Sequence, residues 1–185
     1  MKNTLLLSLF LLPGAVFAQS FEAGVSGGVS RFSNGDLGEG YKLDDGFRLT
    51  FRMGFNPYRY IGGEVGYAYN RTSLSDSTSG QGQGMAVHQG IGAMLLHATP
   101  EGSRVRPFAA GGVHFSNFVP PGQTAQYGQG QTKYGFNYGG GIKVKVTGPW
   151  QVRFDIRQYN TGIPFGLRTG RFKQNEISAG LFYTM

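Results

Sequence analysis

The chain has 185 residues, of which 32 are Gly, 15 are Phe, 10 are Tyr, 1 is Trp and none is Cys. The many aromatic residues argue against simple disorder, and the glycines lack the Gly-X-Y period of collagen. The absence of Cys excludes disulfide scaffolds, cysteine zinc sites and thiol nucleophiles. The formal net charge of +7 is compatible with a nucleic acid or an anionic membrane as partner, and composition does not choose between them.

The first eighteen residues have the three-part layout of a secretory signal peptide. Lys2 supplies the positive start, residues 5–12 form an apolar run, Pro13-Gly14 breaks it, and small Ala18 closes a site that a signal peptidase would read. The run is too short for a permanent transmembrane helix. We therefore expect a cleavable signal peptide at 1–18, one domain over 19–185, and an exported protein with no nucleic acid partner.

From Ser20 onward the sequence alternates with a period of two, which is typical of strands with two unlike faces. In the segment 47–55 every odd position is apolar, and the same alternation returns at 134–146. The pattern predicts eight strands, at 20–32, 47–55, 60–70, 85–97, 105–116, 133–146, 150–159 and 174–185.

The connections between the predicted strands alternate in length. Short turns are expected at 56–59, 99–104 and 147–149, and long polar segments at 33–46, 71–84, 117–132 and 160–173. Such an arrangement is typical of outer-membrane barrels, which have short turns at one end and long loops at the other. The sequence thus predicts an all-β fold, an eight-stranded antiparallel up-and-down transmembrane β-barrel.

Charged residues fall almost entirely on one face of the predicted strands. Arg31 shares the apolar face, whereas twelve charged residues lie opposite it: Glu22, Arg48, Arg52, Glu64, Arg106, Lys133, Lys143, Lys145, Arg153, Asp155, Arg157 and Glu176. A lipid-facing wall demands this separation, because an Arg or Lys at mid-depth costs roughly 2–4 kcal/mol. The alternative is a soluble periplasmic, lipocalin-like binding barrel. The strand at 85–97 fits least well, since Met94 and Leu96 fall on the face assigned to the lumen.

Eight strands enclose an interior that side chains can fill, so inward charges should pair with one another. We expect a lumen plugged by an ion-pair cluster that consists of Glu22, Arg48, Arg52, Glu64, Arg106, Lys143, Lys145, Arg153, Asp155, Arg157 and Glu176. Basic residues outnumber acidic ones on this face, and a narrow anion-permeable pore is therefore the alternative.

The last strand gives the clearest link to a family. Ile177, Ala179, Leu181, Tyr183 and Met185 alternate to the chain end, which resembles the C-terminal strand of small eight-stranded outer-membrane barrels, the OmpA-type transmembrane domain and the porin-like barrels around it. Members usually end in Phe, whereas this chain ends in Met. The resemblance implies a monomer in the outer membrane of a Gram-negative bacterium, surrounded by outer-membrane lipid and lipopolysaccharide and inserted by the β-barrel assembly machinery. It also implies a structural or surface-interaction role.

One short segment resembles an enzyme site. The string His114-Phe115-Ser116-Asn117 is similar to the active-site segment of outer-membrane lipid A deacylases, in which His and Ser join a Glu. No acid follows until Asp155, and alternation turns His114 and Ser116 into the lumen, away from lipid esters. A deacylase-like enzyme thus remains an alternative, and we expect no catalytic residue.

No cofactor or metal is expected either. His88, His97 and His114 have no carboxylate at metal-ligand spacing. The glycine-rich strings at 80–84 and 127–130 lack the Lys-Ser or Lys-Thr of a phosphate loop. If the protein binds a surface ligand, the four long loops would carry it.

Overall fold

The computed structural model describes residues 20–33, 36–38, 40–76, 82–123, 130–165 and 169–185. The elements are β1 (Ser20–Ser33), β2 (Asp36–Gly38), β3 (Tyr41–Leu43), β4 (Gly46–Asn56), β5 (Ile61–Asp76), β6 (Gly82–His97), β7 (Val105–Val119), β8 (Gln131–Thr147), β9 (Trp150–Gly162) and β10 (Arg171–Thr184). The expected signal peptide, at 1–18, lies outside the described residues. Within them, no helix is long and apolar enough to cross a membrane.

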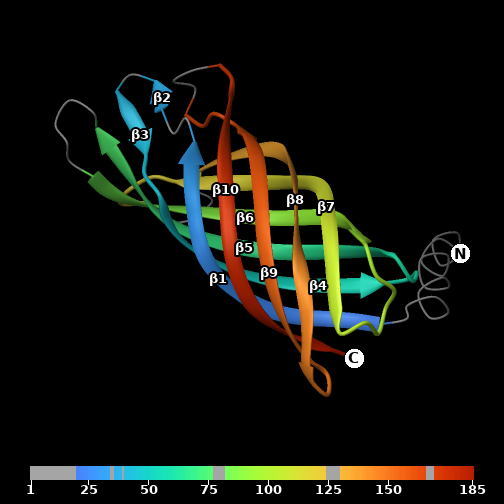
Figure 1. Ribbon diagram of the computed structural model, residues 1–185. Helices are drawn as coiled ribbons and strands as arrows, with labels where there is room; N and C mark the ends of the chain where they lie inside the picture. Colours follow the sequence, from blue (N-terminus) through green and yellow to red (C-terminus); the bar gives the residue numbers. More distant parts are fainter. Residues whose placement is uncertain (1–19, 34–35, 39, 77–81, 124–129, 166–168) are drawn as a thin grey trace, which may run out of the picture.

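The strands form a closed antiparallel barrel. The short strands β2 and β3 lie outside the barrel ring. Each of the other eight strands pairs with the one before it and the one after it in the chain, and β10 pairs with β1, where Val25 lies opposite Leu181. The barrel therefore has no free long edge. Figure 1 shows its two ends. We call the end that carries β2 and β3 the loop end, and the opposite end, where β1 starts and β10 finishes, the turn end.

All eight predicted barrel strands are present, but several are longer than expected at the loop end. β5 runs to Asp76 and β6 starts at Gly82, so part of the expected loop at 71–84 is strand. The short strands β2 and β3 were not predicted. They pair with each other, and β3 continues onto β5 with Tyr41 opposite Asp76. The first long connection thus folds back as additional sheet.

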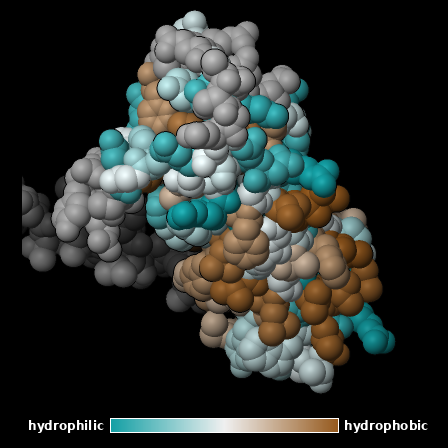
Figure 2. Space-filling model, turned by 90° about the vertical axis from the view of Figure 1, so that its left-hand side faces the viewer, coloured by the Kyte–Doolittle hydropathy of each residue, from teal (hydrophilic) through white to brown (hydrophobic). Residues whose placement is uncertain are grey.

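Through most of the wall, polar residues point inward and apolar residues point outward. On β4, the inward Arg48 and Arg52 are buried, whereas the outward Phe47, Leu49 and Phe51 are 56%, 51% and 45% exposed. Figure 2 shows outward apolar residues gathered in a broad patch on one side of the wall, with hydrophilic residues above it. This is the reverse of a soluble barrel, in which apolar side chains fill the interior.

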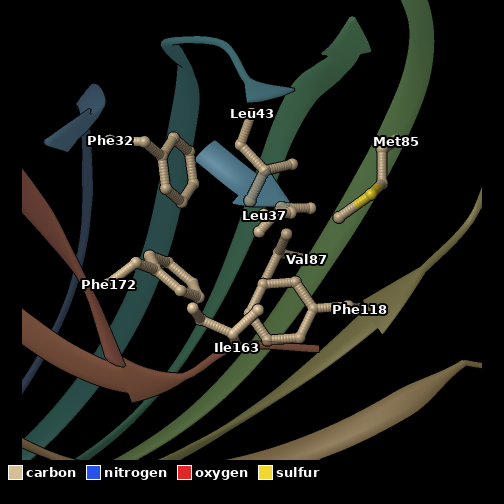
Figure 3. Packing of buried hydrophobic residues seen from close by; sticks show 8 residues of the cluster. All are labelled: Phe32, Leu37, Leu43, Met85, Val87, Phe118, Ile163 and Phe172. Atoms are coloured by element: carbon tan, nitrogen blue, oxygen red, sulfur yellow. The ribbon is translucent and has the colours of Figure 1, made fainter. Parts of the chain in front are cut away.

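Near the loop end the polarity of the two faces inverts. Eight inward apolar residues pack into one buried cluster, which we call the apolar cap: Phe32, Leu37, Leu43, Met85, Val87, Phe118, Ile163 and Phe172 (Figure 3). The outward neighbours of Phe32 are Arg31 and Ser33, and those of Phe172 are Arg171 and Lys173, all exposed. At this end the barrel is built like a soluble one.

The face assignment of the fourth predicted strand is wrong. On β6 most odd positions from Met85 onward, including Ile91 and Leu95, are buried inside, whereas Met94 and Leu96 are 67% and 61% exposed on the outside. The inward face of this strand carries the apolar residues Met85, Val87, Ile91 and Leu95, so both of its faces are apolar in the sequence and the alternation does not distinguish them. Gly90 and Gly92 share the even register of Met94 and Leu96 and therefore lie on the outward face.

Inward glycines make room for large side chains in the narrow interior. A side chain at Gly139 would collide with the backbone of Ile156 and Arg157, and one at Gly141 with Phe154 and the Phe108 ring. Glycine ordinarily weakens a strand interior, and it is retained where another group approaches closely. These positions let the Phe108 ring and the Arg157 side chain of the neighbouring strands lie against the wall.

Candidate functional site

The barrel interior holds a chain of buried ion pairs in which Glu176 of β10 is one centre. Its carboxylate lies 3.1 Å from Nε of Arg48 and 2.7 Å from Nη2 of Arg52, both on β4. The hydroxyls of Tyr159 and Ser178 donate to the same carboxylate at 2.7 and 2.6 Å. Three donors and the Arg48 cation thus hold an acid that is fully buried, which meets the requirement that buried charge be paired and hydrogen-bonded.

A second centre lies nearer the turn end and involves two acids. Nη2 of Arg153 is 2.8 Å from Oε2 of Glu64, and its Nε is 2.8 Å from Oδ2 of Asp155. Arg157 pairs with Asp155 at 3.0 Å and also with Glu64. Arg52 joins the two centres, because it contacts Asp155 at 3.9 Å as well as Glu176. Side chains from β4, β5, β9 and β10 are therefore linked across the lumen.

The turn end has its own ion pair. Nζ of Lys143 lies 2.5 Å from Oε2 of Glu22, and Asn56 donates to the other carboxylate oxygen at 3.0 Å. Arg106 stands 4.0 Å from Glu22 and donates to the backbone carbonyl of Arg59 at 3.1 Å. Beyond this pair a cavity of about 190 Å³ opens towards the turn end.

The structure buries ten of the eleven residues of the proposed ion-pair cluster and leaves Lys145 outside it. Lys145 has the inward register but lies two residues before the end of β8, where it is exposed and lines the turn-end cavity. Among the described residues no ion pair involves it. Its place in the cluster is therefore a correction: the strand has left the closed part of the barrel at this point.

Sequence reasoning missed a layer of uncharged polar residues that covers the ion pairs on the loop side. Gln89 donates to Ser116 at 2.9 Å and to Gln174 at 2.8 Å, and Gln174 donates to Asn70 at 3.2 Å. Arg48 donates to Asn70 at 3.0 Å, so this amide layer continues the ion-pair chain. These residues lie at inward positions of their strands, as the charged residues do. Their inward position could have been predicted from the alternation for Asn70, Ser116 and Gln174, but not for Gln89, because the face of β6 was assigned wrongly.

Aromatic rings line the same space. The guanidinium of Arg153 lies 4.6 Å from the ring centroid of Phe108 and 5.1 Å from that of Phe182, and the guanidinium of Arg48 lies 4.7 Å from the Tyr159 ring. Stacked arginines gain from the negative ring faces and exclude water around the carboxylates. Arginines and aromatic rings thus lie against one another in the interior.

His114 and Ser116 point into the lumen, as alternation predicts, and both are buried. Nε2 of His114 shares a hydrogen bond with Oγ1 of Thr161 at 2.8 Å, whereas Ser116 accepts one from Gln89. No hydrogen bond joins His114 to Ser116 in the described part of the chain, and no acid orients the His. The pair lacks the nucleophile–base contact that an acyl hydrolase requires.

The chain matches the family model of the outer membrane protein beta-barrel domain over residues 4–184. A comparison with curated protein sequences gave no match. Among solved structures, the Neisserial surface protein A is 14% identical, with 88% of this chain and 96% of that chain covered and a TM-score of 0.69.

Two further structures share the fold. The N-terminal barrel domain of Pseudomonas aeruginosa OprF is 13% identical, with 91% and 98% of the two chains covered and a TM-score of 0.54. The E. coli outer membrane protein W is 15% identical, with 91% and 98% covered and a TM-score of 0.53. This chain therefore belongs to the outer membrane protein β-barrel domain family and is an outer-membrane protein of the Gram-negative type.

Proposed function

We propose that the protein is a non-enzymatic outer-membrane barrel with a structural or surface-interaction role, and that its lumen is closed. One observation carries the proposal: the separate Glu22 ion pair at the turn end, the linked ion pairs of Glu64, Asp155 and Glu176, the amide layer and the apolar cap follow one another along the lumen. A continuous water path would have to break several of these contacts at once. A scaffold of this kind presents its loop end to the outside.

Planar bilayer recording tests the closed lumen. The purified full chain, inserted into a bilayer in dilute and in concentrated salt, is expected to give no steady single-channel steps, because each buried charge is already paired. A porin inserted under the same conditions is the positive control. Reproducible steps from this chain at both salt concentrations would overturn the proposal.

A narrow anion-permeable pore is the second candidate, favoured by the charge of the interior. Among the buried residues that the structure describes, six are basic and four are acidic: Arg48, Arg52, Arg106, Lys143, Arg153 and Arg157 against Glu22, Glu64, Asp155 and Glu176. A positive lumen would select anions. Anion-selective steps that disappear when Lys143 and Arg106 are replaced by Gln would establish this candidate.

Enzymatic activity would require the His114–Ser116 pair to change its partners and a lipid ester to enter a filled lumen. Incubation of the protein in detergent with lipid A should release no fatty acid. Release that is lost in Ser116→Ala would contradict the non-enzymatic proposal.

The proposed partners follow from location. We expect outer-membrane lipid and lipopolysaccharide to surround the apolar wall, the assembly machinery to engage β10 during insertion, and the folded barrel to be a monomer. A surface ligand, if there is one, would be bound by the connections at the loop end.

A further inference from the structure

The outward face of β6 differs from the rest of the wall because its loop-side half carries small residues. Gly84, Ala86, Gly90 and Gly92 point outward there, with His88 between them. The outward residues of neighbouring strands are large, such as Tyr67 on β5 and Phe115 on β7. A strand with small residues between two strands with large ones forms a groove.

The structure has a hollow at this place. It measures about 710 Å³, and its outward lining consists of Tyr67, Gly90, Gly92, Val113, Phe115 and Tyr134. A Cβ atom at Gly92 would meet no atom within 4 Å, whereas one at Gly90 would collide with the Phe115 ring, which leans over that glycine. The lining is almost wholly apolar, so the hollow suits a hydrocarbon chain rather than a polar ligand.

Towards the loop end the groove becomes polar in two steps. The hydroxyl of Tyr67 lies 2.5 Å from Nδ1 of His88, and the Tyr69 ring packs edge-on against the same His at 5.3 Å. Arg71 is the next outward residue of β5 after Tyr69, towards the loop end, and its exposed guanidinium lies over Gly84. An apolar hollow, a hydrogen-bonding pair and a cation thus follow one another along the outer wall.

The length of the groove corresponds to one leaflet. From Gly92 to Ala86, which pairs with Arg71, the strand advances about 20 Å at ~3.4 Å per residue. For a strand tilted by ~45° this is about 14 Å of depth, close to half of the ~30 Å hydrocarbon core. A chain lying in the hollow would therefore place its head group beside Arg71.

We infer that this groove on β6 binds the lipid A part of lipopolysaccharide, with an acyl chain in the Gly90–Gly92 hollow and a phosphate at Arg71. The inference rests on the proposal that lipopolysaccharide surrounds the loop-end half of the barrel. It does not depend on whether the lumen is closed, because the groove lies outside. Positive charge at Arg71 matches the phosphate.

The experiment is a titration of purified lipid A into the full chain in nonionic detergent, with bound lipid counted by native mass spectrometry. Gly92→Leu fills the open hollow without a collision, and it should weaken binding about tenfold, as expected when about two methylene groups lose their site. Arg71→Ala should weaken it about fivefold. The matched control is Gly111→Leu on β7, another outward glycine with no atom within 4 Å, which should bind like the parent.

Each outcome has one meaning. No lipid A bound to the parent protein contradicts both this site and lipopolysaccharide as partner. Equal binding to the parent, Gly92→Leu and Arg71→Ala overturns the site alone. Phosphatidylglycerol bound as tightly as lipid A, with the same response to the variants, would assign the groove to phospholipid instead. A dimer that Gly92→Leu dissociates would assign it to a second copy of the chain. Both of the last results overturn the inference.

Discussion

At the residue scale, arginine is the side chain that fills this interior. Arg48, Arg52, Arg153 and Arg157 are among the largest fully buried side chains of the described residues. Each guanidinium offers five donors in a planar fork, so one Arg can bind two carboxylates and still stack on a ring. Lysine would supply a point charge without the planar surface. The network therefore depends on guanidinium geometry as much as on charge.

Removal of one acid should show how strongly the network is coupled. In Glu176→Ala, Arg48 and Arg52 lose their closest carboxylate and Tyr159 loses its acceptor. Breaking a buried ion pair on one side typically costs about 3–5 kcal/mol, so the free energy of unfolding should fall by about that amount. Urea titration of the folded barrel in lipid vesicles, followed by the gel shift between folded and unfolded forms, measures it.

Lys145→Ala provides the matched control. Because this residue is exposed and forms no ion pair among the described residues, its removal should change stability by less than about 0.5 kcal/mol. Equal effects of the two variants would mean that burial and pairing do not govern the stability of this interior.

At the element scale, β6 and the β2–β3 hairpin show where sequence reasoning succeeded and where it failed. Alternation located all eight barrel strands because lipid on one side and paired charges on the other leave few exceptions. It failed on β6, where Met85 and Val87 belong to the inward apolar cap. At the loop end the outer side of the wall faces water, so apolar residues there are buried on the inside. The rule that apolar residues point outward therefore cannot hold along the whole strand.

The hairpin was missed for a related reason. Its segment is polar and rich in Gly, and only Leu37 and Leu43 mark its contribution to the apolar cap. Two isolated apolar residues in a long connection carry no periodicity. Their role depends on Phe32, Phe118 and Phe172 arriving from three other strands, which is information about tertiary packing rather than about the local sequence.

The apolar cap should therefore contribute as much to stability as an ordinary core. The Phe172 ring is 1% exposed and packs at 5.8 Å from Phe32 and 5.7 Å from Phe118, measured between ring centroids. Phe172→Ala should lower the free energy of unfolding by about 3–5 kcal/mol. The smaller truncation Phe172→Leu leaves a smaller cavity and should cost less than Phe172→Ala. The same urea titration compares the two variants. An unchanged free energy of unfolding in Phe172→Ala would mean that the loop end is not packed as a core.

At the scale of the whole molecule, the fold joins two environments in one wall. The middle and turn end place charge inside and apolar surface outside, as a bilayer demands, while the loop end places apolar side chains inside and charge outside, as water demands. The pairing of β10 with β1 closes the barrel, so the wall has an enclosed inside and a separate outside at both ends. An open sheet in the membrane would leave backbone groups without partners in hydrocarbon.

A cysteine pair across the closing seam tests closure and register together, since the chain has no Cys of its own. Val25 and Leu181 are directly opposite on the outward face, where antiparallel Cα atoms are about 4.5–5.5 Å apart, within the range of a disulfide. The V25C/L181C variant should therefore oxidise readily and, after heating without reductant, migrate faster than its reduced form. In V25C/A179C the partners are diagonal, at about 7–8 Å, so oxidation should be slow. Faster oxidation of the diagonal pair would show a seam shifted by two residues, and none in either would show that β1 and β10 do not pair.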